Sequence, residues 1–399
     1  MNNSNFDDIR PYFDSEVNEV LARVLATPDF IRAMAHLRFP TLARIVPWIA
    51  YPLVRWGLTK KAAKLNTVHD VQLMVLQYLQ QMKARTVSDM TVSGVEYLPQ
   101  DRACLFISNH RDIVLDPALV NYALHENGQR TIRIAVGDNL MTQKYVEDLI
   151  RVNKSFVVKR SAKSPREKLK ASKQLSAFIH QSLTVDNEHI WIAQREGRAK
   201  NGDDRTNPAV ISMLGLNRPK AEPFADYVKS LNIVPVAISY EWDPCDVAKA
   251  KELHCIAESG CYEKQHSEDI DSIVAGFTGQ KGHIHLAFGQ PLQGEYESAE
   301  AVANAINEQI WQLYRVQASN QFAYKKLQDD NAKPATADEQ QAQQMLNTRM
   351  QHLSAQEAAL LLQMYARPVA NQRHELLNND SATDDVDDQL QLTEAAAIH

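Results

Sequence analysis

The segment 105–117 contains the side chains best suited to acid–base chemistry. An apolar run at 105–107 is followed by His110, and two carboxylates, Asp112 and Asp116, come after the histidine. An imidazole beside a carboxylate is the pair that a general base needs, because the carboxylate fixes the tautomer and stabilises the imidazolium that forms. The residues alone leave open which carboxylate is the partner of His110.

The position of His110 relative to the predicted elements also favours a site. The apolar run predicts a strand that ends at Ile107, and in open α/β sheets ligands bind beyond the carboxyl ends of strands. Asp116 followed by Pro117 is also typical of a helix start, with Asp as N-cap and Pro at the first helical position. The alternative is therefore that Asp116 only caps a helix and that His110 has no catalytic role.

Basic residues gather between positions 151 and 200. Nine Lys or Arg lie between Arg151 and Lys173, against the single acid Glu167. The part from 168 to 173 predicts a solvated helix face. Four other basic residues follow predicted strands, where they could converge on a phosphate: Lys159, Arg160, Arg198 and Lys200. A nucleic acid partner is not expected, because no aromatic residues interleave with the cations and no known binding module is present.

From residue 92 onward, short apolar runs alternate with stretches of helical periodicity. This alternation predicts an α/β fold with a largely parallel central sheet flanked by helices. The predicted strands are 104–107, 132–136, 156–158, 190–193, 233–239 and 284–288. The predicted helices are 117–124, 141–149, 165–182, pieces after 223, and 301–314, with a further helix at 354–365.

The N-terminal region is predicted to be helical. Residues 12–36 and 67–83 have apolar positions at helical spacing. The apolar segment 39–58 between them contains three prolines and two arginines, which exclude a continuous membrane-spanning helix. Its aromatic residues, including Trp48 and Trp56, and the flanking cations suit a bilayer interface. A buried helical hairpin is the alternative.

Composition excludes several protein classes. A chain of 399 residues with 44% apolar and 23% charged residues is an ordinary globular protein. The net charge of −6 comes from seven acids after His374, so the first 373 residues carry +1. The four cysteines fit neither a disulfide framework nor zinc-ligand spacing, so no metal site is expected. No secretory signal is visible, which favours the cytoplasm.

The motifs around His110 resemble those of the glycerolipid acyltransferase family. The first motif of that family is Asn-His, four residues, then Asp. Here Asn109-His110 is followed by five residues and then Asp116, one residue more than the pattern, and the Asp-Pro context of the motif is retained. The resemblance therefore assigns the role of the family's Asp to Asp116, with Asp112 as the rival.

Later segments agree with this resemblance in the order that the family requires. Residues 154–161 resemble the second motif, a strand running into two basic residues, and residues 194–202 resemble the Glu-Gly motif, here Glu196-Gly197. The second Gly of the glycerol-3-phosphate enzymes is missing, and Arg195 replaces the usual Pro or Val. Residues 233–241 resemble the fourth motif, and 286–292 resemble the terminal Gly-x-Pro turn.

The resemblance, which covers about residues 92–315, implies an enzyme of phosphatidic acid synthesis. It would move a fatty acyl group from an acyl thioester (acyl-CoA or acyl carrier protein) to glycerol-3-phosphate or 1-acylglycerol-3-phosphate. No cofactor beyond this co-substrate is expected. His110 would be the general base, oriented by Asp116 or Asp112. The substrate-binding residues would be Asn109, Lys159, Arg160, Glu196, Gly197, Arg198 and Lys200.

Three alternatives to this function remain open at the level of sequence. The acceptor could be another lipid, or the chain could be a non-catalytic lipid-binding relative, which the altered His-to-Asp spacing motivates. Cys104 could act covalently only if its thiol lay within hydrogen-bond reach of His110. The acceptor is therefore less firmly indicated than the acyl transfer itself.

The resemblance also implies a domain organisation and a membrane partner. Relatives often carry an N-terminal membrane-associating helical motif, so we expect peripheral attachment to the cytoplasmic face of the inner membrane. The expected parts are a helical N-terminal region (1–90), the acyltransferase domain (91–320), a helical extension (321–377) and a disordered acidic tail (378–399).

Overall fold

The computed structural model describes residues 6–264 and 268–374, and the predicted disordered tail lies outside these residues. The chain forms two compact units, Met1–Gln80 with Arg133–Ser161 and Gln81–Ile132 with Ala162–His399. We call them the first and the second unit and describe each by itself.

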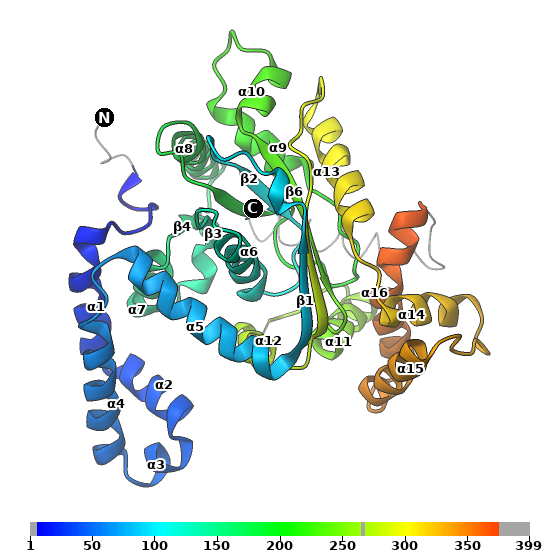
Figure 1. Cartoon of the computed structure of the whole chain (residues 1–399), viewed down its shortest axis with the longest axis horizontal. Coiled ribbons are helices and arrows are strands. Elements are labelled where there is room, and N and C mark those ends of the chain that lie inside the picture. The colour runs from blue at the N-terminus through cyan, green and yellow to red at the C-terminus, as the bar shows by residue number, and fades with distance from the viewer. Residues whose placement is uncertain (1–5, 265–267, 375–399) are drawn as a thin grey trace. The chain divides into compact units, whose positions relative to one another are not determined.

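The second unit is built on five strands. They are β1 (Val87–Ser93), β7 (Gly282–Phe288), β6 (Ile233–Tyr240), β2 (Leu105–Ser108) and β5 (Ile190–Ala193), hydrogen-bonded in that order. Figure 1 labels β1, β6 and β2 of this set. Three of the four pairings are parallel, and β6 with β7 is antiparallel. Strands β2 and β6 are buried along their whole length, which is why they appear in the sequence as continuous apolar runs. The predicted α/β class with a largely parallel sheet is confirmed.

Helices alternate with these strands in the second unit. Strand β2 leads into α6, and α8 begins with a capping box in which Ser164 and Glu167 bond each other's backbone N–H groups. Exposed basic side chains line the start of α8, as expected for a solvated face. The helices that follow the strands are α6 (Leu115–Glu126), α8 (Pro165–Thr184), α9 (Pro208–Leu214), α10 (Phe224–Ser230), α11 (Asp246–Ser259), α12 (Glu268–Thr278) and α13 (Ala299–Leu313).

Three further helices of the second unit share a core of their own. They are α14 (Ala318–Gln328), α15 (Ala337–Met350) and α16 (Ala355–Arg373). Phe322, Leu346, Leu361 and Tyr365 pack together there with Trp242, which lies two residues after the end of β6. The extension is therefore joined to the sheet through a shared apolar cluster.

The first unit is mainly helical. It contains α1 (Val17–Ala26), α2 (Pro28–Arg38), α3 (Pro40–Ile45), α4 (Pro47–Ala62), most of α5 (Val68–Thr86), α7 (Lys144–Val152) and the parallel pair β3 (Arg133–Gly137) and β4 (Ser155–Val158). Val17, Val20, Val71 and Val152 form its core. The fully buried carboxylate of Asp148 joins α7 to α1 through Arg23, whose Nε lies 2.7 Å away.

Two predictions of secondary structure are wrong in detail. The helix predicted at 12–36 is divided at Thr27, because Pro28 begins α2. Strand β1 was not predicted at all, since its sequence Val-Ser-Asp-Met-Thr-Val-Ser is mostly polar and directly continues a helix. Backbone hydrogen bonds to β7 hold it in the sheet, and its amino-acid composition does not indicate them.

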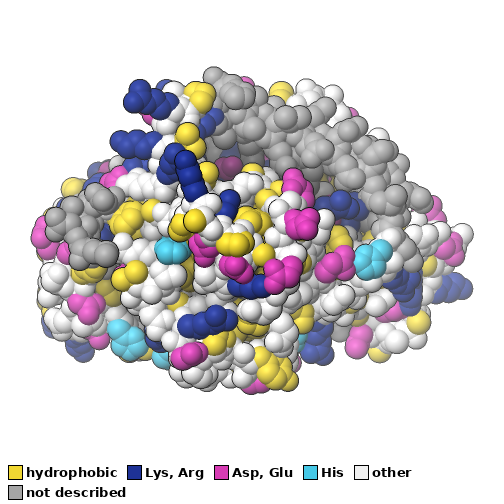
Figure 2. All heavy atoms as spheres, turned by 90° about the horizontal axis from the view of Figure 1, so that it is seen from above, with side chains coloured by type: hydrophobic (Ala, Val, Ile, Leu, Met, Phe, Trp, Pro, Cys, Tyr) yellow, Lys and Arg dark blue, Asp and Glu magenta, His cyan; other side chains and the backbone are white. Residues whose placement is uncertain are grey.

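The surface carries mixed side chains. On the face drawn in Figure 2, basic, acidic and apolar side chains lie among one another. In the first unit, several large apolar side chains are exposed, among them Trp48 at 70% and Trp56 at 59%. Within the described residues, every helix is too short or too polar to cross a bilayer.

Candidate active site

The loop after β2 holds His110 at the carboxyl end of the strand, as the sequence predicts. Asn109 fixes its start, because its side-chain amide accepts a hydrogen bond from the Ile238 N–H (2.8 Å) and donates one to the Ile238 carbonyl (3.0 Å). The carbonyl of His110 accepts from the Ala199 N–H at 2.9 Å. Asn109 is fully buried, so its side chain serves the attachment of this loop to β6.

His110 is paired with Asp116. The Nδ1 nitrogen of the imidazole lies 2.8 Å from Oδ2 of the carboxylate, which is fully buried, whereas the His110 side chain keeps 14% of its surface exposed. Among the described residues, Nε2 of His110 makes no hydrogen bond. An Nδ1–H held by a carboxylate leaves the Nε2 lone pair available, which is the arrangement of a general base.

The same carboxylate also organises the loop between the two residues. Oδ2 of Asp116 accepts the backbone N–H groups of Arg111 (2.6 Å) and Asp112 (2.9 Å). Its other oxygen, Oδ1, accepts the hydroxyl of Tyr240 at 2.8 Å. Asp116 is not the N-cap that the sequence predicted, because α6 begins at Leu115 with Val114 as N-cap. Its carboxylate reaches back from the first turn of the helix to the loop.

Asp112, the rival partner, has a different place. Its Oδ1 accepts the backbone N–H groups of Val114 (3.0 Å) and Leu115 (2.9 Å), so it closes the turn that begins α6. Its Oδ2 lies against Gly276 of α12, where a Cβ atom would be only 2.2 Å away. Burial and the nearby charge of Asp116 raise the pKa of Asp112. The structure thus brings His110 together with Asp116 and leaves Asp112 to the helix start.

Trp191 of β5 packs against the imidazole of His110. The two rings meet edge to face, with centroids 5.6 Å apart and planes inclined by 71°. The indole Nε1–H donates to Oγ of Ser108 at 2.9 Å, which fixes the ring. An apolar neighbour of this kind limits the orientations of His110 and covers one side of it.

Beneath the loop, Arg111 forms a buried ion pair. Its Nη2 lies 2.6 Å from Oδ2 of Asp204 and 3.2 Å from the carbonyl of Gly202. Burial raises the pKa of Asp204 to about 6, although the Arg111 guanidinium acts in the opposite direction. The side chain of Arg111 is thereby used in holding the loop to segment 202–204.

The residues of the Glu-Gly segment after β5 differ in their exposure and in their contacts. Glu196 is exposed, and Gly197 adopts a left-handed conformation (φ 71°) that favours glycine. Arg198 is half-buried, and its Nη2 donates to Oγ of Ser272 at 3.3 Å, while its buried Nη1 has no hydrogen-bond partner in the described structure. Lys200 forms an ion pair with Glu252 of α11.

The other two predicted phosphate ligands belong to the first unit. Lys159 follows β4 and forms an ion pair with Asp8. The backbone N–H of Arg160 donates to Oδ1 of Asp138 at 3.0 Å. Their convergence with Arg198 and Lys200 stays a prediction.

Cys104 is not placed to act as a nucleophile. It precedes β2 whereas His110 follows it, so the two lie at opposite ends of the strand. Its side chain is fully buried, and burial raises the pKa of its thiol to about 12. A thiol with so high a pKa is almost entirely protonated at neutral pH, which makes it a poor nucleophile.

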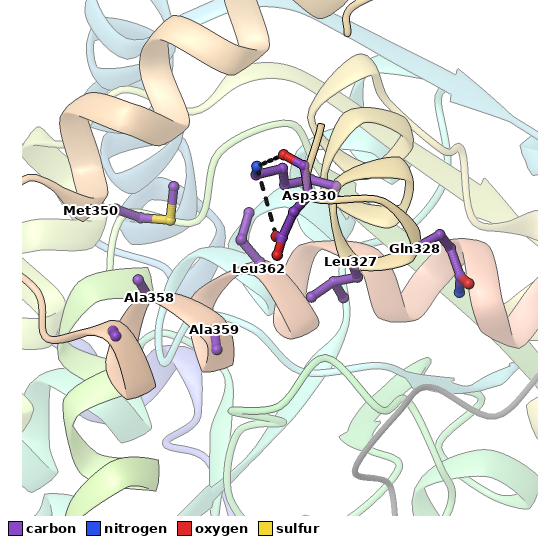
Figure 3. Close-up of a pocket in the computed structure, with 9 residues that line it drawn as sticks. Leu327, Gln328, Asp330, Met350, Ala358, Ala359 and Leu362 are labelled. Carbon is purple, nitrogen blue, oxygen red and sulfur yellow. Dashed lines mark hydrogen bonds and ion pairs between the residues drawn. The ribbon is translucent and has the colours of Figure 1, made fainter. Parts of the chain in front are cut away.

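Other candidate sites in the described residues lie apart from this one. A hollow of about 400 Å³ lies among α14, α15 and α16, lined by residues such as Met350, Ala358 and Leu362, with Lys326 bonded to Asp330 beside it (Figure 3). None of the predicted site residues lines this hollow. In the described part of the chain, no group of three or more His, Cys, Asp or Glu side chains could hold a metal ion.

Two residues that contact the His110–Asp116 pair were not predicted from the sequence. Tyr240 lies at the end of β6, 124 positions after Asp116, and Trp191 lies inside an apolar run that reads as an ordinary strand. The only available signal was the sheet itself, because parallel neighbours of β2 end at the same edge.

Comparison with known proteins finds a family similarity in the segment that carries this site. Residues 89–239 match the Acyltransferase family, a segment that includes His110, Asp116 and the Glu-Gly motif. No curated protein matches the chain significantly.

Among solved structures, the chain is similar to the crystal structure of the 1-acyl-sn-glycerophosphate (LPA) acyltransferase PlsC from Thermotoga maritima. The identity is 15%, the alignment covers 70% of this chain and 90% of that one, and the TM-score is 0.36. At this level the likeness supports no argument.

Proposed function

We propose that this chain, whose residues 89–239 form a domain of the acyltransferase family, is a glycerolipid O-acyltransferase. It would transfer a fatty acyl group from an acyl thioester, acyl-CoA or acyl carrier protein, to glycerol-3-phosphate or 1-acylglycerol-3-phosphate. Its product would enter phospholipid synthesis.

The observation that carries the proposal is the pair formed by His110 and Asp116. The 2.8 Å contact at Nδ1 leaves Nε2 to take the proton from an acceptor hydroxyl. The hydroxyl oxygen then forms a bond to the thioester carbonyl carbon. When the tetrahedral intermediate collapses, the carbon–sulfur bond breaks, and the proton returns from Nε2 to the leaving thiolate. Asp116 stabilises the imidazolium between these two steps.

Arg198 supports a phosphorylated acceptor. It follows the Glu-Gly motif, and a guanidinium with an unused N–H is suited to a phosphate oxygen. Lys200 next to it is already paired with Glu252, so its charge is partly compensated. We therefore assign the main phosphate contact to Arg198.

The exposed apolar side chains of the first unit support peripheral membrane attachment. Trp48 and Trp56 are largely exposed on α4, and Nζ of Lys60 lies 3.8 Å from the centre of the Trp56 ring. Indole rings and lysines are the side chains that sit at headgroup level in a bilayer. The surface would be the cytoplasmic face of the inner membrane.

Two other functions make different predictions. An acyltransferase for another lipid would also use His110 as the base and would differ only in the molecule that receives the acyl group. A non-catalytic lipid-binding protein would not need His110 and Asp116 within hydrogen-bond reach. The 2.8 Å contact between them favours an enzyme.

An acyl-transfer assay tests the proposal. The purified full chain is given a labelled acyl-CoA or an acyl carrier protein thioester, together with glycerol-3-phosphate, 1-acylglycerol-3-phosphate or other lysolipids. We expect transfer to a phosphorylated glycerol acceptor and a loss of about 10²- to 10⁴-fold in His110→Ala, since that is the usual contribution of a general base. Full activity in His110→Ala, with normal folding by circular dichroism, would show that the mechanism is wrong.

A further inference from the structure

The peptide group between Arg111 and Asp112 is held on both sides. Its N–H, which belongs to Asp112, donates to Oδ2 of Asp116 at 2.9 Å. Its carbonyl, which belongs to Arg111, accepts from Nζ of Lys249 at 2.8 Å. Oδ2 is also the atom that holds Nδ1 of His110, so an uninterrupted chain of hydrogen bonds runs from the Lys249 ammonium to the imidazole.

Lys249 lies on α11 and is almost completely buried, with 2% of its surface exposed. Its ammonium is 2.5 Å from Oδ2 of Asp243. Burial would raise the pKa of Asp243, but the charge and the hydrogen bond of Lys249 outweigh it and lower the pKa below its ordinary value. A buried lysine is costly unless it is paired and hydrogen-bonded, so its position here is closely defined.

Helices α15 and α16 contact Asp243, the ion-pair partner of Lys249. The backbone N–H of Asp243 donates to the hydroxyl of Tyr365 (3.1 Å), and that hydroxyl donates to Oδ2 of Asp246 (2.6 Å). Arg349 of α15 donates from Nη1 to the carbonyl of Asp243 at 3.0 Å and to the same carboxylate of Asp246. Burial raises the pKa of Tyr365 well above 10, so its hydroxyl stays a donor.

A second contact brings α16 to the same loop. Gly202, whose carbonyl accepts from Arg111, has φ of 80°. A Cβ atom at this position would lie 2.3 Å from the carbonyl oxygen of Met364 on α16. The helix therefore packs directly on the backbone that supports Arg111.

We propose that Lys249 is a positioning residue for His110, acting through the Arg111–Asp112 peptide and Asp116, and that α15 and α16 hold Lys249 in place. The ammonium polarises the peptide carbonyl and so strengthens the hydrogen bond that the same peptide donates to Asp116. The helices after residue 336 lie outside the matched segment 89–239, yet they form part of the catalytic unit. The catalytic part of this inference rests on the proposed function, whereas the hydrogen-bond geometry does not.

The first test compares turnover in Lys249→Met with that in a matched control. Lys229→Met breaks another ion pair of the same unit, between α10 and Glu295, and touches neither the loop nor α15 and α16. We expect kcat to fall about 10- to 100-fold in Lys249→Met with KM changed less than about twofold, since misplacement of a catalytic group acts on the chemical step. Lys229→Met should keep the wild-type kcat. An unchanged kcat in folded Lys249→Met would overturn the proposal.

The second test does not depend on activity. The Nδ1 proton of a histidine bonded to a carboxylate gives a far-downfield NMR signal, which His110→Gln assigns by its disappearance. We expect this signal to move upfield or to be lost to solvent exchange in Lys249→Met and to stay unchanged in Lys229→Met. An unchanged signal in Lys249→Met would overturn the positioning role. A shifted signal in a protein without acyl transfer would instead retain the positioning and refute the proposed function.

Removal of Lys249 alone leaves the carboxylate of Asp243 buried and unpaired, which could prevent folding. The double variant Asp243→Asn/Lys249→Met removes both charges and keeps the side-chain volumes. If Lys249→Met does not fold, the double variant is compared with the single variant Asp243→Asn by the same two measurements. We expect the double variant to have a lower kcat than Asp243→Asn and a shifted or lost Nδ1 proton signal. Equal kcat values and an unchanged signal would overturn the proposal.

Discussion

Tyr240 donates its hydroxyl to Oδ1 of Asp116, the carboxylate oxygen that His110 does not use. The hydroxyl is fully buried, and burial together with the charge of Asp116 raises its pKa well above 10. Tyr240 therefore stays protonated at neutral pH. Asp116 is thus fixed from both oxygens, by a side chain of β6 on one and by the loop and the imidazole on the other.

Tyr240→Phe should reduce activity by releasing one oxygen of Asp116. A hydrogen bond to a charged group contributes about 1.5–3 kcal/mol, and we expect a loss of this order in the free energy of unfolding. The carboxylate would also be less firmly oriented, so kcat should fall by about tenfold. Urea unfolding and steady-state kinetics measure the two effects.

Tyr227→Phe is the matched control for this substitution. Tyr227 is also buried, and its hydroxyl donates to the carbonyl of Leu214 at 3.1 Å, away from His110. It should lose about 1 kcal/mol of stability with an unchanged kcat. Equal kcat values in the two variants would show that Tyr240 is only structural.

Arg198→Ala should weaken acceptor binding. The loss of a charge-assisted hydrogen bond to phosphate is expected to raise KM for the acceptor about tenfold or more, with little change in KM for the acyl donor. Arg218→Ala is a suitable control, since the guanidinium of this arginine donates to the carbonyl of Glu222, away from His110. An unchanged acceptor KM in Arg198→Ala would remove this residue from the phosphate site.

Replacement of Trp48 and Trp56 by Ser should reduce binding to vesicles. Each ring would contribute about 1.5–3 kcal/mol if it became buried at the interface. The double variant should therefore bind at least tenfold more weakly in co-sedimentation with vesicles of phosphatidylglycerol and phosphatidylethanolamine. Tyr97→Ser/Val185→Ser removes two side chains that are similarly exposed in the second unit, 63% and 68%, and should bind as the wild type does. Equal binding of both double variants would count against membrane attachment through α4.

His285 should make stability depend on pH. Burial, Arg315 and His283 lower the pKa of His285 to about 4, whereas an unfolded chain takes up this proton near pH ~6.5. As the pH falls from 6.5 towards 4, the unfolded state therefore binds more protons, and the free energy of unfolding decreases. At pH 7 the folded state is neutral at this position and most unfolded chains are too, so the effect is small.

His285→Gln keeps a hydrogen-bonding side chain for the hydroxyls of Thr91 and Ser93 but cannot be protonated. Its stability relative to the wild type should rise between pH 6.5 and 4.5. The raised pKa of Asp204 makes the free energy of unfolding of both proteins fall as the pH rises from about 4 to 6, opposite to the effect of His285. The quantity to measure is therefore the difference in the free energy of unfolding between the two proteins. Parallel stability curves would contradict the prediction.

The sequence predicted the positions of most elements and His110, with Asp116 and Asp112 as the two candidate partners of its imidazole. Buried strands such as β5 are continuous apolar runs in the sequence. Ser164 and Glu167 form a capping box, a pattern that is typical of a helix start, at the beginning of α8. His110 was predicted because its type and its place after a strand are local features. Tyr240 and Lys249 were not, because they reach the site only through the pairing of β6 with β2 and the packing of α11. Local periodicity contains no information about such distant contacts.

Strand β6 is buried along its whole length and lies between β2 and its antiparallel neighbour β7. A fragment that ended with the family match at residue 239 would lack β7 and expose a long apolar edge, which is a template for aggregation. A recombinant fragment that covers this edge must therefore continue through β7, and one that keeps the apolar cluster around Trp242 must also include α14 to α16. For protein production, the boundary of the family match is not the boundary of the folding unit.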